Sequence, residues 1–166
     1  MATAENLKAA FAGESQANRM YTAFARKAET EGLKQIAKLF RAVAAAETVH
    51  ALNHFRVMGG VKTTVENLKT AQAGESYEFK EMYPAFVAES IADGNRPAER
   101  SFGDAMAVEQ VHSALYGDAL AAAGAGKDLP AASVYVCEVC GNTVVGSVPE
   151  RCPICGAIHT KFTEVQ

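Results

Sequence analysis

The chain has 166 residues, of which 49% are apolar, and its net charge is −3, so it can hold one ordinary domain and a small additional module. Both signs of charge are spread along the sequence without a long basic run, which argues against nucleic acid and anionic membrane as partners. No segment reaches the roughly 20 apolar residues of a membrane-spanning helix, and MATAENLKAA at the N-terminus lacks the pattern of a secretory signal. We therefore expect a cytoplasmic protein that does not enter membranes.

Residues 4–123 are rich in Ala, Glu, Lys, Leu and Met, and their pattern predicts four helices. Thr63 and Glu66 have the spacing of a capping box that opens the third helix, and Asn95 with Pro97 fits the start of the fourth. Glycine beyond a helix end is the usual stop signal, and the sequence has such glycines at Gly32, Gly59, Gly60 and Gly94. The predicted helices span residues 4–31, 34–58, 64–92 and 96–123.

An internal repeat relates the two halves of the helical part. Three motifs of the first half recur in the second: NLKAAFAGES of 6–15 as NLKTAQAGES of 67–76, Met20-Tyr21 as Met82-Tyr83, and Glu47-x-x-His50 as Glu109-x-x-His112. The first motif recurs at an offset of 61 and the other two at 62, so the second half has one extra residue between Glu75 and Met82. An inserted residue in a continuing helix predicts a π-bulge, a feature often found at functional sites, and Pro84 should also disturb this helix locally.

Glutamates interrupt the apolar stripe of every predicted helix near its middle. Steps of three and four residues place these carboxylates on the apolar faces: Glu14, Glu47, Glu75, Glu78 and Glu109. An unpaired carboxylate in a core costs several kcal/mol, roughly, and five would exceed the roughly 5–15 kcal/mol stability of a typical domain. Because no Lys or Arg lies in the stripes near four of these groups, Glu14, Glu47, Glu75 and Glu109, bound metal cations are expected to neutralise the carboxylates.

Two Glu-x-x-His pairs, with a glutamate from each of the other two helices, form the ligand set of a di-iron or di-manganese site in a bundle core. Carboxylates with imidazole suit iron or manganese better than a thiolate-seeking metal. One such pair is common on a solvated helix, but two pairs at matched repeat positions are a much more specific signal. His54 shares the face of Glu47 and His50 without a counterpart in the second half, so we expect it not to be a ligand.

Two tyrosines and one further histidine remain outside this ligand set. Tyr21 and Tyr83 occupy matching repeat positions, one or two turns from the ligands. They are expected to be core aromatic residues whose hydroxyls need partners, or to hydrogen-bond the ligand carboxylates, or both. His159 follows the last cysteine and is expected to be exposed.

The C-terminal part has a different composition, rich in Val, Cys, Gly and Pro, which predicts short strands and tight turns. Its cysteines form two Cys-x-x-Cys-Gly motifs eleven residues apart: Cys137, Cys140, Cys152 and Cys155. In a chain without an export signal these are metal ligands rather than disulfides, and the spacing indicates a tetrahedral four-thiolate site. Spacing alone leaves iron and zinc open. A redox-active di-iron site consumes electrons, and a four-thiolate iron can supply them one at a time. This favours iron in the four-cysteine site.

The order of these motifs, Gly-Glu-Ser, Glu-x-x-His, Gly-Glu-Ser-Tyr-Glu, Met-Tyr-Pro, Glu-x-x-His and then the two Cys-x-x-Cys-Gly motifs, resembles the rubrerythrin family over nearly the whole chain. The resemblance implies an all-α, ferritin-like four-helix bundle in residues 1–123, a linker in 124–134, and a rubredoxin-like β module in 135–166. It also implies an oxidoreductase, a non-haem di-iron peroxidase that reduces hydrogen peroxide to water in oxidative-stress defence. The expected redox partner is a rubredoxin or an NAD(P)H-dependent reductase.

The resemblance also assigns roles to individual residues. It implies that Glu47 and Glu109 bridge the two irons, with Glu14, Glu75 and His112 as further ligands. One iron is expected to move between Glu78 when oxidised and His50 when reduced, and Tyr21 and Tyr83 match family tyrosines near the site. The catalytic candidates are thus Glu78, His50, Tyr21 and Tyr83. The cofactors are an oxo- and carboxylate-bridged di-iron pair and one iron in the four-cysteine site, where zinc is the alternative metal.

The link between the second and third helices is too short for a bundle closed within one chain. Nine residues separate His50 from Gly59, and twelve separate Thr63 from Glu75, so the crossover between parallel helices must span about 31 Å. Gly59 to Thr63 reaches at most about 18 Å. We therefore expect a helix-swapped homodimer in which each site combines Glu14, Glu47 and His50 of one chain with Glu75, Glu78, Glu109 and His112 of the other.

Two alternatives come from other classes. An iron-oxidising or iron-storage protein uses the same bundle but normally lacks a four-cysteine tail, and it would load iron far above three per chain. A metal-stabilised binding protein would hold zinc in the tail and would lack the visible absorption of a ferric thiolate.

Overall fold

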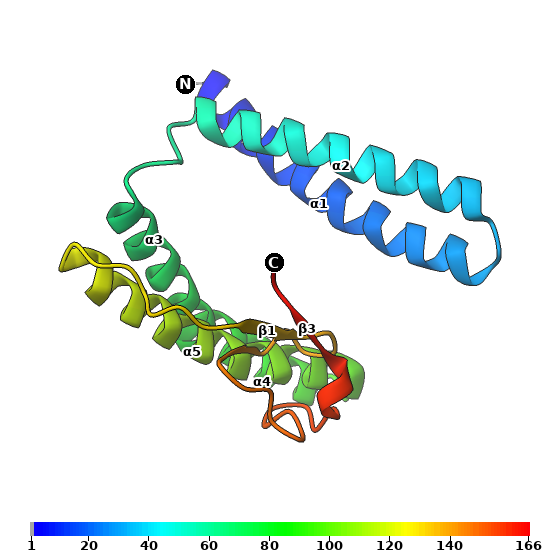
Figure 1. The fold of residues 1–166 in the computed structure, drawn as a ribbon. Helices are drawn as coiled ribbons and strands as arrows, with labels where there is room; N and C mark the ends of the chain where they lie inside the picture. The colour runs from blue at the N-terminus through cyan, green and yellow to red at the C-terminus, as the bar shows by residue number, and fades with distance from the viewer. Residues whose placement is uncertain (1) are drawn as a thin grey trace. The chain divides into compact units, whose positions relative to one another are not determined.

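The computed structural model describes residues 2–166, which form two compact units, one ending at Lys62 and the other spanning Thr63–Gln166. Figure 1 gives the elements in chain order. Unit 1 contains α1 (Ala2–Thr30) and α2 (Lys34–Val57). Unit 2 contains α3 (Thr64–Tyr77), the π-helical turn η1 (Glu78–Met82), α4 (Tyr83–Ala92), α5 (Arg96–Gly124), β1 (Val134–Cys137), β2 (Thr143–Val145), the 3-10 turn η2 (His159–Lys161) and β3 (Phe162–Glu164).

Unit 1 is an antiparallel helix hairpin that turns at Gly32, whose φ of 78° favours glycine. Small residues line the seam between the helices, so their backbones approach closely; the buried alanines are Ala25, Ala28, Ala37, Ala44 and Ala51. Asn18, also buried, donates from Nδ2 to the Ala44 carbonyl at 2.5 Å and to Thr48 Oγ1 at 2.7 Å. These bonds fix the relative height of the two helices at the level of the predicted ligands.

The helical part of unit 2 is a second helix hairpin, in which the π-helical turn η1 interrupts the first arm between α3 and α4. The Thr63–Glu66 capping box opens α3, and Asn95 caps α5 by accepting from the Ala98 backbone N–H at 3.2 Å. Both were predicted from the sequence, and so was the π-bulge, which the structure places at Glu78–Met82. Pro84 lies at the start of α4 directly after this turn, where its missing N–H is tolerated.

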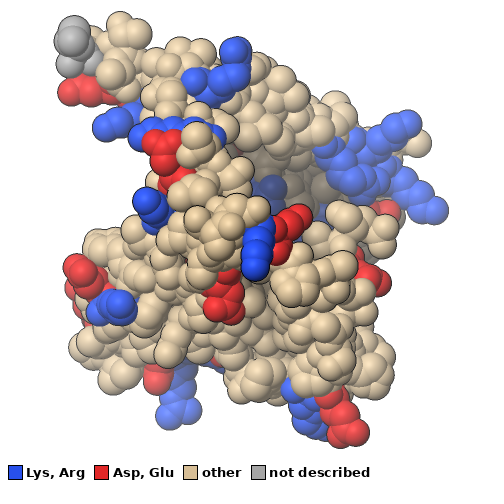
Figure 2. Space-filling view, turned by 60° about the vertical axis from the view of Figure 1, so that its left-hand side comes forward, with Lys and Arg blue, Asp and Glu red and all other residues tan. Residues whose placement is uncertain are grey.

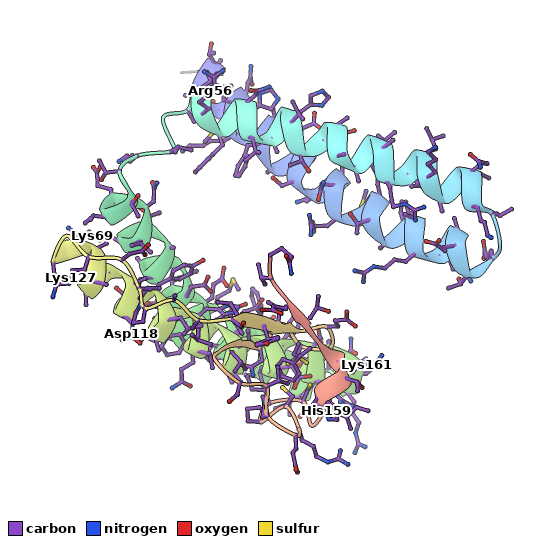
Figure 3. All side chains as sticks on the ribbon, in the orientation of Figure 1. Arg56, Lys69, Asp118, Lys127, His159 and Lys161 are labelled. Carbon is purple, nitrogen blue, oxygen red and sulfur yellow. The ribbon has the colours of Figure 1, made fainter. Side chains whose placement is uncertain are left out.

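A small antiparallel sheet forms the C-terminal module, in the strand order β2-β1-β3. Tyr135 of β1 pairs with Val144 of β2 on one side and with Glu164 of β3 on the other. The structure thus confirms a helical protein with a small four-cysteine β module. His159 is exposed on η2 beside Lys161, as expected, and Lys127 lies just after the end of α5 (Figure 3).

Several large apolar side chains are exposed within each unit, although the sequence stripes predict them to be buried. Ile36 is 47% exposed, Leu39 63% and Val57 63%. The reason is that α2 turns its alanine face, not these larger residues, toward α1. A two-helix hairpin has no further layer with which to cover its second apolar face.

The surface charge agrees with the composition. Basic and acidic side chains appear in small groups separated by neutral area on the face in Figure 2. Among the described residues, no helix combines the length and the apolar character needed to span a bilayer.

Candidate metal centres

The first cluster of potential ligands lies in unit 1, between the middle turns of α1 and α2. Ligand atoms of Glu14, Glu47 and His50 all lie within 4.8 Å of one another. His50 Nδ1 is 2.9 Å from Glu47 Oε2 and 4.0 Å from Glu14 Oε1. A hydrogen bond shared with Glu47, then burial and the Glu47 charge, raise the pKa of Glu14, whereas the charges of His50 and His54 act in the opposite direction.

The second cluster lies in unit 2, between α3 and α5, and has the same composition. Glu75, Glu109 and His112 again bring their ligand atoms within 4.8 Å of one another. His112 Nδ1 is 2.8 Å from Glu109 Oε2 and 3.9 Å from Glu75 Oε2. Burial, followed by the hydrogen bond and the charge of Glu109, raises the pKa of Glu75 to about 7. Carboxylates held this close without a Lys or Arg partner fit a bound cation.

The extra residue of the second half affects the surroundings of this cluster. Glu78 is the first residue of η1 and is not a member of the three-residue ligand group. Burial and then the Glu109 charge raise its pKa, and its own charge contributes to the raised pKa of Glu75. Glu78 therefore lies close enough to interact with the cluster without being part of it.

The two predicted tyrosines each pack in a trio of aromatic rings. Tyr21 lies 6.2 Å from Phe24 and 6.3 Å from Phe40 between ring centroids; Tyr83 lies 6.2 Å from Phe86 and 6.3 Å from Phe102. The repeat offset of 62 also relates these phenylalanines, Phe24 with Phe86 and Phe40 with Phe102, so the sequence contains a signal for both trios. Burial and then the charges of Glu109, Glu78 and Glu75 raise the pKa of Tyr83, which places its hydroxyl within electrostatic reach of the cluster.

The four cysteines converge in the C-terminal module as free thiols. Cys137 Sγ is 3.7 Å from Cys155 Sγ, and Cys140 Sγ is 3.6 Å from Cys152 Sγ. A tetrahedral ion with metal–sulfur bonds of about 2.3 Å requires sulfur–sulfur separations of about 3.8 Å. The geometry therefore fits a single four-thiolate metal.

Backbone amides around the sulfurs favour the thiolate form. Burial disfavours ionisation of Cys152, but the backbone N–H groups of Cys155 and Ile154 outweigh it and lower the pKa to about 7. Gly141 and Gly156 each follow the second cysteine of a motif, and their φ angles of 87° and 75° are those of tight turns that favour glycine. The tight Cys-x-x-Cys-Gly turns predicted from the sequence are thus present.

One residue that the sequence did not single out joins the module to the second cluster. Thr143 of β2 places its Oγ1 2.9 Å from His112 Nε2. Beside this contact lies a largely apolar cavity of about 890 Å³, lined by Glu75, His112, Tyr116 and Thr143 among others. Asp118, further along α5, also lines it (Figure 3).

Comparison with known proteins decides the family. Residues 5–120 match the family model of rubrerythrin, and residues 135–163 match that of the rubredoxin-like domain of rubrerythrin. This chain belongs to the rubrerythrin family. Rubrerythrin-2 of Clostridium acetobutylicum is 36% identical over 96% of this chain and 95% of its own length. Nigerythrin of Nitratidesulfovibrio vulgaris is 38% identical over 97% of this chain and 85% of its own length.

Solved structures support the assignment of the fold. A nigerythrin described as partially reduced matches with a TM-score of 0.59 and 35% identity over 98% of this chain and 86% of that chain. A second, described as fully reduced and all ferrous, gives the same TM-score and identity. Together with the carboxylate–histidine clusters and the four thiolates, the family assigns a di-iron site and a rubredoxin-like iron site to this protein.

The raised pKa of Glu75 predicts how metal-free protein responds to pH. Between the ordinary value of 4.5 and about 7, the folded state holds a proton that the unfolded state has lost, so stability falls as pH rises through this window. Glu75→Gln should remove most of this dependence, whereas Glu81→Gln, at an exposed position of η1, should not. Denaturant midpoints of metal-free protein at pH 5 and pH 7.5 measure it; equal pH dependence in wild type and Glu75→Gln contradicts the prediction.

Proposed function

We propose that this protein is a cytoplasmic peroxidase that reduces hydrogen peroxide to water and receives electrons through its four-cysteine iron. The observation that carries the proposal is the combination, in one chain, of two matched Glu-Glu-His clusters with a four-thiolate site that contacts one of them through Thr143. The physiological role that fits is defence against peroxide, with a rubredoxin or an NAD(P)H-dependent reductase as the electron donor.

Some of the proposed ligands stay bound to the metal throughout, and others exchange. When bound, the iron pair supplies two electrons and Lewis acidity for cleavage of the O–O bond. The His112 side chain is 25% exposed and bonded on both ring nitrogens, which suits a constant ligand. The His50 side chain is 55% exposed, which leaves it more room to move than His112 has. We assign His50 and Glu78 as the alternative ligands that exchange when the site changes its oxidation state.

Protons must accompany the electrons, because each peroxide needs two of both to become two waters. Tyr83 is suited to hold a proton beside the site, since burial and the neighbouring carboxylates raise its pKa. A protonated phenol can donate to the departing oxygen, whereas a phenolate could not. Tyr21 occupies the equivalent place in unit 1 and is assigned the same role.

The two clusters form one dinuclear site only when unit 1 of one chain pairs with unit 2 of another. Gly59 to Thr63 reaches at most about 18 Å, against the crossover of about 31 Å that parallel helices require. The exposed apolar residues of unit 1, including Leu39 at 63% and Leu52 at 61%, favour burial against such a partner. We therefore propose a helix-swapped homodimer.

A mixed dimer tests the swap. Glu47→Ala and Glu109→Ala homodimers should both lack a working site. In a hybrid of the two variants, the swap joins both defects in one site and leaves the other site fully wild-type, so about half of the wild-type turnover should return. Activity should be measured on hybrids isolated with two different affinity tags. If purified hybrids are as inactive as the homodimers, both clusters of a site come from one chain and the swap is wrong.

A stopped-flow peroxide assay tests the proposed reaction. Fully reduced protein, mixed anaerobically with one equivalent of peroxide per dinuclear site, should consume all of it and develop ferric absorption. Metal analysis should give three irons per chain. Continued iron uptake far above three per chain, without peroxide turnover, would identify an iron-storage protein instead. Zinc in the four-cysteine site without turnover would indicate a binding protein.

A further inference from the structure

Thr143 is the point at which the four-cysteine module contacts a ligand of the dinuclear site. It is the first residue of β2, and its Oγ1 lies 2.9 Å from His112 Nε2. The neighbouring Gly141 packs on the same helix: a Cβ at this glycine would lie 3.9 Å from Val108 Cγ1, and Val108 is only 2% exposed. The module therefore contacts α5 through Thr143, and Gly141 lies close to the same helix, both within unit 2.

The direction of the hydrogen bond follows from the other partners of the two residues. His112 Nδ1 faces Glu109 Oε2 at 2.8 Å, among the carboxylates, so Nδ1 is the nitrogen available to metal. When a metal is bound at Nδ1, Nε2 carries the proton. Thr143 can donate its own hydroxyl proton to the Gly141 carbonyl at 3.3 Å, which leaves its oxygen free to accept from His112. A histidine ligand held this way has a fixed tautomer and ring orientation.

The same segment leads directly to a sulfur of the four-cysteine site. The Asn142 backbone N–H bonds the Cys140 sulfur and opposes the burial that raises the pKa of this thiol. Asn142 itself is buried, and its Nδ2 donates toward Cys152 Sγ at 3.8 Å. The path from the Cys140 sulfur to the His112 ring thus has two hydrogen bonds, one from the Asn142 N–H to the sulfur and one from the ring to Thr143 Oγ1. Asn142 and Thr143 are consecutive, so the whole path lies within one chain.

We propose that Thr143 is a positioning residue for His112, and that its hydroxyl directs electrons from each four-cysteine iron to the dinuclear site bearing His112 of the same chain. The inference rests on the proposed function. In each transfer, one Fe(II) of the four-cysteine site is oxidised to Fe(III), and one Fe(III) of the dinuclear site is reduced to Fe(II). Two transfers balance one peroxide, and the donor protein returns both electrons.

Substitution of Thr143 tests its role as a positioning residue. Thr143→Val keeps the side-chain shape but removes the hydroxyl, and Thr143→Ser keeps the hydroxyl. The valine variant should slow re-oxidation of the ferrous four-cysteine site, followed by its visible absorption, by about 10- to 100-fold, a larger change than in single-turnover oxidation by peroxide. The serine variant should restore the rate. Thr163→Val is the matched control, because Thr163 is in the same sheet and donates to Glu138 instead.

A readout independent of turnover comes from the histidine ring. Nitrogen NMR of protein loaded with diamagnetic Zn²⁺ should show a hydrogen-bonded His112 Nε2–H that exchanges slowly with solvent in wild type and Thr143→Ser, and a rapidly exchanging one in Thr143→Val. If the valine variant keeps wild-type transfer and a slowly exchanging Nε2–H, the role of Thr143 is wrong although the peroxidase function stands. If wild-type protein does not turn over peroxide, the proposed function itself fails.

The same-chain route is tested with hybrid dimers. One chain carries His112→Ala and the other Cys152→Ser, so that no chain has both an intact four-cysteine site and an intact His112. Transfer within a chain predicts negligible turnover. The control hybrid, with both changes on one chain and a wild-type partner, should retain about half of the wild-type turnover because one complete chain remains. Turnover in the first hybrid that equals or exceeds that of the control hybrid would show that electrons cross between chains and would overturn the route.

Discussion

Replacement of Cys152 by serine is expected to abolish steady-state peroxide turnover while leaving the first oxidation of the reduced dinuclear site intact. Cys152 is 3% exposed, and its sulfur lies 3.6 Å from Cys140 Sγ. The loss of one of four thiolates leaves a module of this size without the metal that holds it folded. The dinuclear ligands all come from the helices, so they can still react once with peroxide.

Two measurements separate these effects. Stopped-flow absorption follows the single oxidation, and a coupled assay with a reduced donor protein follows steady-state turnover. Iron content should fall from three to two per chain. Steady-state turnover at the wild-type rate would rule out the four-cysteine site as the electron relay, and loss of the single oxidation as well would mean that the module is needed to form the dinuclear site.

Replacement of Glu78 by glutamine is expected to lower turnover by about 10- to 100-fold with little loss of iron. Glu78 interacts electrostatically with Glu75 and Glu109 but stands outside the ligand cluster. Its removal should therefore affect the exchange of ligands more than the binding of metal. Glu81→Gln is the matched control, since Glu81 is on the same π turn but exposed. Parallel losses of iron and turnover would argue against a mobile ligand at this position.

Much of the fold followed from local signals in the sequence. A few neighbouring residues determine each of three local features: the capping box at Thr63 and Glu66, the cap at Asn95 and the π turn at Glu78–Met82. Residue patterns and the offset of the internal repeat were therefore sufficient to predict them. Burial was predicted less well. Leu39 and Val57 lie on the apolar stripe of α2, but the closest packing with α1 uses the alanine face instead, and periodicity cannot choose between two adjacent faces.

The candidate site shows the same division between local and long-range information. Glu-x-x-His spacing places Glu109 and His112 together because they are one turn apart on a single helix. The contact between His112 and Thr143 joins residues of α5 and β2 that are 31 positions apart, and no local sequence pattern predicts it. The ring trios around Tyr21 and Tyr83 could have been found, because the repeat offset also relates their phenylalanines.

Anomalous X-ray diffraction from crystals of the iron-loaded protein tests the central proposal most directly. We predict two iron peaks between the carboxylates of Glu47 from one chain and Glu109 from the other, with a third, separate peak among the four cysteine sulfurs. Glu47 and Glu109 directed into solvent with no iron between them would contradict the proposed dinuclear site.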